Sequence, residues 1–164
     1  MAGLLEIAEG FPHRTLAAGE VLLTDGHDVD ALYVLVSGTL QVRKGGVTVT
    51  TVGQPGACVG EMSLLLGAPA TADVVAVAPS EVAVIADARA MLDAEQHAGH
   101  LTLELARMLA GRLQVMTTYL VDLKQQYADH EGGLGMVDVV LGTLMQGAGP
   151  KRELKSARDP DPEY

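Results

Sequence analysis

The chain has 164 residues, of which 48% are apolar, and this is enough for one domain of ordinary size with a second small element. Its formal net charge is −10, from 11 basic and 21 acidic residues, which argues against a DNA-reading domain because such surfaces are basic. Cys58 is the only cysteine, so the chain cannot form an intramolecular disulfide or hold an iron–sulfur cluster by itself.

The N-terminus has no basic segment followed by a long apolar run, and no stretch of about 18 apolar residues occurs in the chain. We therefore expect a soluble, cytoplasmic protein that does not use a membrane as a partner.

Residues 1 to about 87 consist of short apolar runs separated by glycines. The runs are rich in Val, Leu and Thr, which favours strands. The predicted strands are Glu20–Thr24, Ala31–Ser37, Thr39–Lys44, Val47–Val52, Val74–Val77 and Glu81–Ala86. Gly45 and Gly46 lie between two of them and predict a hairpin turn. Repeated short strands joined by turns indicate a sandwich or barrel.

Residues 88 to about 130 change to a helical period. Apolar residues recur every three or four positions and form one stripe: Leu105, Leu109, Leu113, Met116, Leu120, Leu123 and Tyr127. This face is widened by Leu101, Met108, Val115 and Tyr119, and Gly132-Gly133 ends the helix. A helix of about 30 residues is roughly 45 Å long and exposes more apolar surface than one small roll can cover. The stripe predicts a homodimer interface, and the alternative is a core helix that packs only within its own chain.

The C-terminal part holds one short amphipathic segment, Met136–Met145, and a charged tail, Lys151–Tyr164, which we expect to be flexible. The predicted organisation is a ligand-binding β-roll over 1–97, a long helix over 98–130, a short helix within 131–149 and a polar tail over 150–164.

The segment 59–76 carries the most informative motif. Gly60-Glu61 leads from a predicted strand into a short apolar helical turn, Met62–Leu66, and the chain turns back at Gly67–Pro69. Free backbone N–H groups at a helix start can bind an anion, and a carboxylate there can accept hydrogen bonds from sugar hydroxyls.

This segment resembles the phosphate-binding cassette of the cyclic nucleotide-binding domain superfamily. The resemblance runs from about His13 to about Tyr127 and includes Gly19-Glu20, Gly26, the run Tyr33–Gly38 and the spacing of these glycines to Gly60-Glu61. Arg112–Val115 resembles part of the long C-terminal helix of that family. The resemblance implies a mainly β fold with α: a double-stranded β-roll of jelly-roll or cupin-like type, with a short N-terminal helix and a long C-terminal dimerisation helix.

The resemblance also implies roles for individual residues. The Gly60 backbone N–H would contact the ligand and Glu61 would bind the ribose hydroxyl, whereas Met116 and Thr117 match positions that face the purine in some members. The complete set of expected ligand-binding residues is Gly60, Glu61, Met62, Ala70, Thr71, Ala72, Met116 and Thr117.

One position departs from the family pattern. In the register set by Pro69, Ala70 occupies the place of the arginine that pairs with the cyclic phosphate. A desolvated bidentate contact of this kind contributes about 2–5 kcal/mol by analogy with interface charge pairs. Its loss weakens binding roughly 30- to 3000-fold. No basic residue lies between Lys44 and Arg89, and Asp73 adds a carboxylate nearby.

Three interpretations of the ligand therefore stay open. The domain binds a cyclic nucleotide such as cAMP more weakly than a complete cassette would, it senses a different small effector, or it is a dimeric interaction module without a ligand. Arg112 could reach the site from the long helix, although a solvated role suits it better.

An enzymatic function has less support from the sequence than a regulatory one. We expect that the protein is not an enzyme and holds no metal and no cofactor. A cupin metalloenzyme needs clustered His and carboxylate ligands. None of the histidines forms a His-x-His pair beside a suitable Glu. The five histidines are His13, His27, His97, His100 and His130. Haem ligation by Cys58 lacks an attachment motif, and neither Cys58 nor Ser63 has a His-Asp pair at a spacing typical of nucleophilic catalysis.

The expected mechanism is regulatory. A ligand bound between the cassette and the long helix would reposition that helix and its dimer partner, provided that it binds two states with different affinity. Residues 131–164 are too few for a complete winged helix-turn-helix, so we expect output through a protein partner and no direct contact with nucleic acid.

Overall fold

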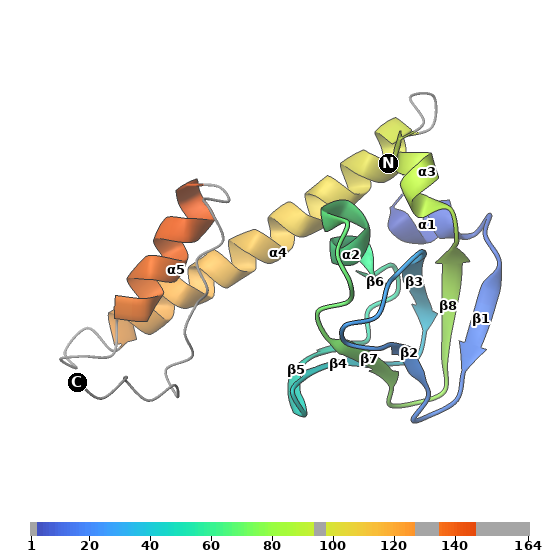
Figure 1. Ribbon diagram of the computed structural model, residues 1–164, viewed down its shortest axis with the longest axis horizontal. Helices are drawn as coiled ribbons and strands as arrows, with labels where there is room; N and C mark the ends of the chain where they lie inside the picture. The colour runs from blue at the N-terminus through green and yellow to red at the C-terminus, as the bar shows by residue number, and fades with distance from the viewer. Residues whose placement is uncertain (1–2, 94–97, 127–134, 147–164) are drawn as a thin grey trace. The chain divides into compact units, whose positions relative to one another are not determined.

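The computed structural model describes residues 3–93, 98–126 and 135–146, and the chain divides into two compact units, Met1–Leu109 and Ala110–Tyr164. The first unit contains every strand of the described chain, three short helices and the first turns of a long helix (Figure 1).

Two four-stranded antiparallel sheets make up the body of the first unit. One sheet has the order β1-β8-β3-β6, with bounds His13–Leu16, Ser80–Ile85, Leu32–Ser37 and Cys58–Val59. The other has the order β2-β7-β4-β5, with bounds Val21–Leu23, Asp73–Ala76, Leu40–Lys44 and Val47–Val52. This arrangement confirms the predicted β-roll.

The first sheet is buried on both faces. Successive side chains of a strand point to opposite sides of the sheet, so each strand can contribute to two core clusters. On β3, Leu32 and Val34 belong to one core cluster and Leu35 to the other. The short strand β6 divides in the same way, with Cys58 in the first cluster and Val59 in the second. The second cluster lies between the two sheets, while the first lies between the β3 sheet and the helices.

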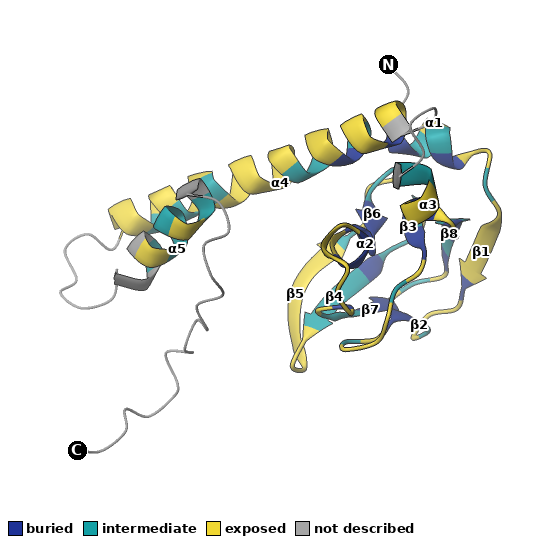
Figure 2. Cartoon of the chain, turned by 45° about the horizontal axis from the view of Figure 1, so that its top comes forward, coloured by how far each residue is buried: buried dark blue, intermediate teal, exposed yellow. Residues whose placement is uncertain are grey.

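Helices cover the outer face of the β3 sheet. These are α1 (Leu4–Ala8), α3 (Ala88–Asp93) and the beginning of α4 (Ala98–Gln126). Leu101 and Leu105 of α4 are each 2% exposed and belong to the first core cluster, against which Met108 packs. Figure 2 shows buried positions in the first turns of α4. Leu105, the first residue of the predicted dimer stripe, is thus already covered by its own chain.

The second unit contains the rest of α4 and α5 (Gly135–Gln146). Here the predicted stripe is less covered: Leu113 and Met116 are 44% and 54% exposed, and Leu120 and Leu123 are half-buried. Tyr127, Gly132-Gly133 and the tail lie outside the described residues. None of the described helices is long and apolar enough to cross a membrane.

Six strands were predicted from the apolar runs, and all six are present. Val47–Val52 matches in full, and the other five are displaced by one residue at one or both ends. The runs did not predict β1, whose only buried residue is Leu16, or the two-residue β6. The Gly45-Gly46 turn joins β4 and β5 with positive φ at both glycines, as predicted.

Gly38 joins β3 to β4 at a point where no side chain fits. Its φ is +92°, and a Cβ atom would lie 2.5 Å from the Pro79 carbonyl oxygen and would also overlap Ser80 Oγ. That hydroxyl accepts a hydrogen bond from the Thr39 N–H and donates one to the Ala78 carbonyl.

We expect Gly38→Ala to lower the free energy of unfolding by about 2–5 kcal/mol through backbone strain and overpacking. Urea unfolding followed by circular dichroism measures this change. Gly53→Ala is the matched control, since its nearest neighbour would be Thr39 Oγ1 at 3.8 Å. Equal stabilities of the two variants would contradict the packing described for Gly38.

Candidate functional site

The cassette begins at Gly60, which is the N-cap of α2 (Glu61–Leu66). Gly60 has φ +93°, and a Cβ atom there would lie 2.9 Å from the Ala31 carbonyl oxygen and 3.3 Å from Val29 Cγ1. Glycine therefore lets the start of α2 lie directly against the segment between β2 and β3. The first N–H groups of the helix have no partner within the helix itself.

Glu61 follows at the first position of α2 and is only 4% exposed. Its Oε2 lies 4.0 Å from Cys58 Sγ, and the same sulfur lies 3.3 Å from Met108 Sδ of α4. The carboxylate is thus buried where β6, α2 and the first part of α4 meet. The position expected to bind a ribose hydroxyl is connected to α4 through one cysteine side chain.

Tyr33 of β3 lies beside Gly60 at the same end of the roll. Burial raises the pKa of its phenol, and the nearby Asp30 carboxylate raises it further. The hydroxyl therefore stays protonated at neutral pH and adds no charge to this side of the cassette.

The C-terminal end of α2 is closed by a residue from α3. Gly67 ends α2 in the left-handed conformation, with φ +62°. Arg89 Nη2 donates a 2.7 Å hydrogen bond to the Leu64 carbonyl oxygen, which a helix end leaves without a partner in the helix. Arg89, the first basic residue after the cassette in the sequence, is therefore engaged in holding α2.

Ala70 is held in place by its backbone. Its N–H donates to the His27 carbonyl and its carbonyl accepts from the Gly26 N–H, both at 2.8 Å. The methyl side chain is 6% exposed. This pairing fixes the cassette against the turn after β2, so a side chain at position 70 would have a defined origin.

Asp73 has a structural role in the same turn. Its Oδ1 accepts a 2.8 Å hydrogen bond from the Asp25 N–H, and the Asp25 carboxylate in turn pairs with Lys44 Nζ at 2.8 Å. The nearest basic residue before the cassette in the sequence is thus neutralised by Asp25. Lys44 and Arg89 thus each have a partner away from Ala70, whose match to the arginine position of the family stays a prediction.

The remaining expected ligand-binding residues divide between the two units. Met62 and Thr71 are exposed and Ala72 is half-buried, all within the cassette of the first unit. Met116 and Thr117 belong to the second unit, so their contact with a ligand stays a prediction. The structure brings together Gly60, Glu61 and Met62 on α2 and places Ala70, Thr71 and Ala72 between α2 and β7.

His13 and His27 each lie beside an oxygen atom of another residue. His13 Nδ1 lies 2.7 Å from Glu81 Oε1 across β1 and β8, and His27 Nδ1 lies 3.3 Å from the Asp25 carbonyl. His97 and His130 lie outside the described residues. Across residues 3–93, 98–126 and 135–146, no three His, Cys, Asp or Glu side chains form a group that could hold a metal ion.

A comparison with protein-family models identifies the family to which this part of the chain belongs. The model described as the cyclic nucleotide-binding domain matches residues 13–93, about half of the chain. Residues 13–93 form a cyclic nucleotide-binding domain. The match covers both sheets and the cassette, and it confirms the resemblance found in the motif.

One curated protein is similar in sequence to part of this chain. A cAMP-dependent protein kinase regulatory subunit from Yarrowia lipolytica is 34% identical over 73 residues, which are 44% of this chain and 19% of the relative. The chain thus spans about a fifth of that relative's length.

Solved structures show the same fold. A cyclic nucleotide-binding domain from Methylobacillus flagellatus KT superposes with a TM-score of 0.61 at 23% identity, over 73% of this chain and 81% of that one. The regulatory subunit of a cAMP-independent protein kinase A from Trypanosoma brucei superposes with a TM-score of 0.52 at 25% identity, over 60% of this chain and 35% of that one.

Proposed function

We propose that this chain is a regulatory module whose cassette binds a cyclic nucleotide, such as cAMP, with an affinity lowered by Ala70. The observation that carries the proposal is the start of α2, where Gly60 presents the helix N-terminus and Glu61 is buried beside it. A backbone N–H suits a phosphate oxygen, and a carboxylate suits the ribose hydroxyls.

The same proposal includes output through α4. Cys58 lies between Glu61 and Met108, so a ligand that displaces Glu61 changes the packing under α4. Beyond Leu109, α4 carries exposed apolar side chains at Leu113, Val115, Met116 and Tyr119. We propose that this surface joins two copies of the chain and that the dimer acts on a protein partner rather than on nucleic acid or a substrate.

A second candidate is a sensor for an effector that lacks an anionic cyclic phosphate. Ala70 favours it because the cassette offers no cation to pair with such a phosphate. The solved structure from Trypanosoma brucei is described as the regulatory subunit of a cAMP-independent protein kinase A, and this description supports an effector other than cAMP. Glu61 would then bind the hydroxyls of a different ligand.

Isothermal titration with cAMP and with cGMP tests the proposal. We expect weak, saturable binding of at least one of them, and we expect Glu61→Gln to weaken it about tenfold or more because a charge-assisted hydrogen bond is lost. Glu104→Gln, on α4 outside the cassette, is the charge-matched control and should bind as the unaltered chain does.

Two results would overturn the leading proposal. If neither nucleotide gives saturable heat at millimolar concentration, the second candidate or a module without ligand is correct. If binding occurs and Glu61→Gln leaves it unchanged while the variant stays folded, the cassette is not the binding site.

A further inference from the structure

The second unit has no buried core among the residues that the structure describes. The last buried apolar residue along the described chain is Leu105, which belongs to the first unit. Within 110–126 and 135–146, every side chain whose burial is described is half-buried or exposed (Figure 2). Helices in proteins are stabilised mainly by packing an apolar face against another element. The apolar faces of these two helices therefore need a packing partner.

The apolar face of α4 is wide in this unit. At 3.6 residues per turn, six apolar or aromatic residues between positions 113 and 123 fall within about 160° of the helix circumference. They are Leu113, Val115, Met116, Tyr119, Leu120 and Leu123. The other five residues of this stretch lie outside the sector. The seam of a two-stranded coiled coil is narrower, because it uses two positions of every seven. This part of α4 can therefore contact more than one neighbouring helix.

Half of the circumference of α5 is apolar as well. Six of its 12 residues fall in one sector of about 180° that contains no polar residue. They are Met136, Val137, Val140, Leu141, Leu144 and Met145. The described side chains of this sector are half-buried, and the two exposed side chains, Val139 and Thr143, lie outside it. An isolated helix of this length is marginally stable in water, and a sector this wide exceeds the stripe that faces one neighbour.

The charges of the second unit allow two copies of the chain to meet there. The whole chain has a net charge of −10, so like charge opposes the association of two copies. The segments 110–126 and 135–146 are balanced, with Arg112 and Lys124 against Asp122 and Asp138. The excess negative charge therefore lies elsewhere in the sequence, and these helices can pack on a second copy with little repulsion.

We infer that α5 forms part of a dimer interface, in which two copies of α4 and two copies of α5 pack as a four-helix bundle. In such a bundle each helix contacts at least two others, which matches the wide apolar sectors of α4 and α5. Two chains then supply the core that the described residues of one chain lack. The inference rests on the dimer proposed above, to which it adds α5, and it does not depend on the nucleotide site.

Sedimentation equilibrium of the full chain without nucleotide tests the role of α5. Leu144→Glu places a charge at a half-buried position inside the apolar sector, and Thr143→Glu is the matched control at an exposed position outside it. The Thr143 hydroxyl donates to the Val139 carbonyl of the same helix, so this control removes only a local contact. We expect Leu144→Glu to raise the dissociation constant at least about tenfold, because both copies lose an apolar contact. We expect Thr143→Glu to change it less than about twofold.

A mixed sample of methyl-labelled and unlabelled chain shows which copy supplies the contacts, and it uses only the unaltered protein. We expect nuclear Overhauser contacts between the Val140 and Leu144 methyl groups of one copy and protons of the other copy. Contacts confined within one copy would overturn the inference.

Two further results would also overturn it. If the chain is dimeric and Leu144→Glu dissociates no more readily than Thr143→Glu, the α4 interface stands without α5. A monomeric unaltered chain would overturn both the α4 interface and the role of α5. Failure of cAMP and cGMP to bind is a separate result, because neither measurement contains a nucleotide.

Discussion

Ala70→Arg is expected to raise the affinity for cAMP roughly 30- to 3000-fold, which corresponds to the about 2–5 kcal/mol of a desolvated charge pair. The backbone of Ala70 is fixed by hydrogen bonds to Gly26 and His27, so the new side chain begins from a defined place in the cassette. Oδ1 of the nearby Asp73 already accepts a hydrogen bond from the Asp25 N–H. Isothermal titration of both proteins with cAMP measures the gain.

Ala68→Arg is the matched control for this gain. Ala68 lies in the same cassette and is exposed, so its variant adds the same charge without placing it at the position of the family arginine. We expect at most a few-fold effect there. An equal gain in both variants would mean that net charge limits binding, and no gain in a folded Ala70→Arg would mean that position 70 does not face the phosphate.

Leu113→Glu combined with Leu120→Glu is expected to convert a homodimer to monomers, with the dissociation constant raised at least about 100-fold. Each copy of the dimer would lose two apolar side chains from the interface, and full burial of one leucine contributes about 1.5–3 kcal/mol. Both residues lie on α4 beyond Leu109, where Leu113 is 44% exposed. Sedimentation equilibrium over a concentration series measures the change.

A second double variant separates loss of the apolar face from added charge. Thr118→Glu with Gln125→Glu introduces the same charges at the same seven-residue spacing, at two exposed positions on α4 outside the stripe. We expect it to remain dimeric. A monomeric unaltered chain, or equal dissociation of both double variants, would contradict the proposed interface.

Most of the fold can be predicted from the sequence, because the spacing of apolar residues along a segment indicates which of its faces are buried. The alternation in β3, with Leu32 and Val34 on one face and Leu35 on the other, is the kind of pattern that a sheet buried on both sides requires. The strand β1 carries one buried residue, Leu16, and β6 has only two residues. Neither segment contains a pattern long enough to predict a strand.

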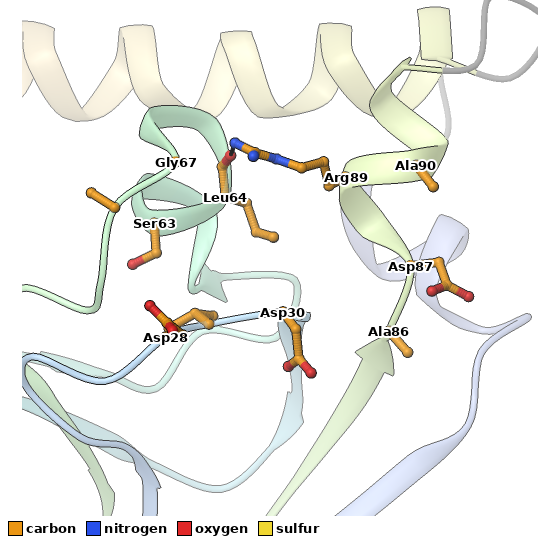
Figure 3. A pocket seen from close by; sticks show the side chains of 11 residues that line it. Asp28, Asp30, Ser63, Leu64, Gly67, Ala86, Asp87, Arg89 and Ala90 are labelled. Atoms are coloured by element: carbon orange, nitrogen blue, oxygen red, sulfur yellow. Dashed lines mark hydrogen bonds between the residues drawn. The ribbon is translucent and has the colours of Figure 1, made fainter.

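The start of the cassette is also predicted from the sequence, because Gly60 is required where its backbone lies against Ala31. The contacts made by Arg89 and Asp73 are not predicted, because each depends on a partner distant in the chain. Arg89 reaches the carbonyl of Leu64, and Asp73 accepts a hydrogen bond from the turn at Asp25. The pocket lined by α2, the start of α3 and the segment between β2 and β3 (Figure 3) likewise depends on residues that are distant in the chain.

A crystal structure of the full chain grown with millimolar cAMP tests the central claim most directly. The account predicts a nucleotide in the cassette, with its ribose hydroxyls on the Glu61 carboxylate, its phosphate near the Gly60 N–H and no cationic side chain from position 70. An empty cassette, or a nucleotide bound elsewhere on the chain, would contradict the account.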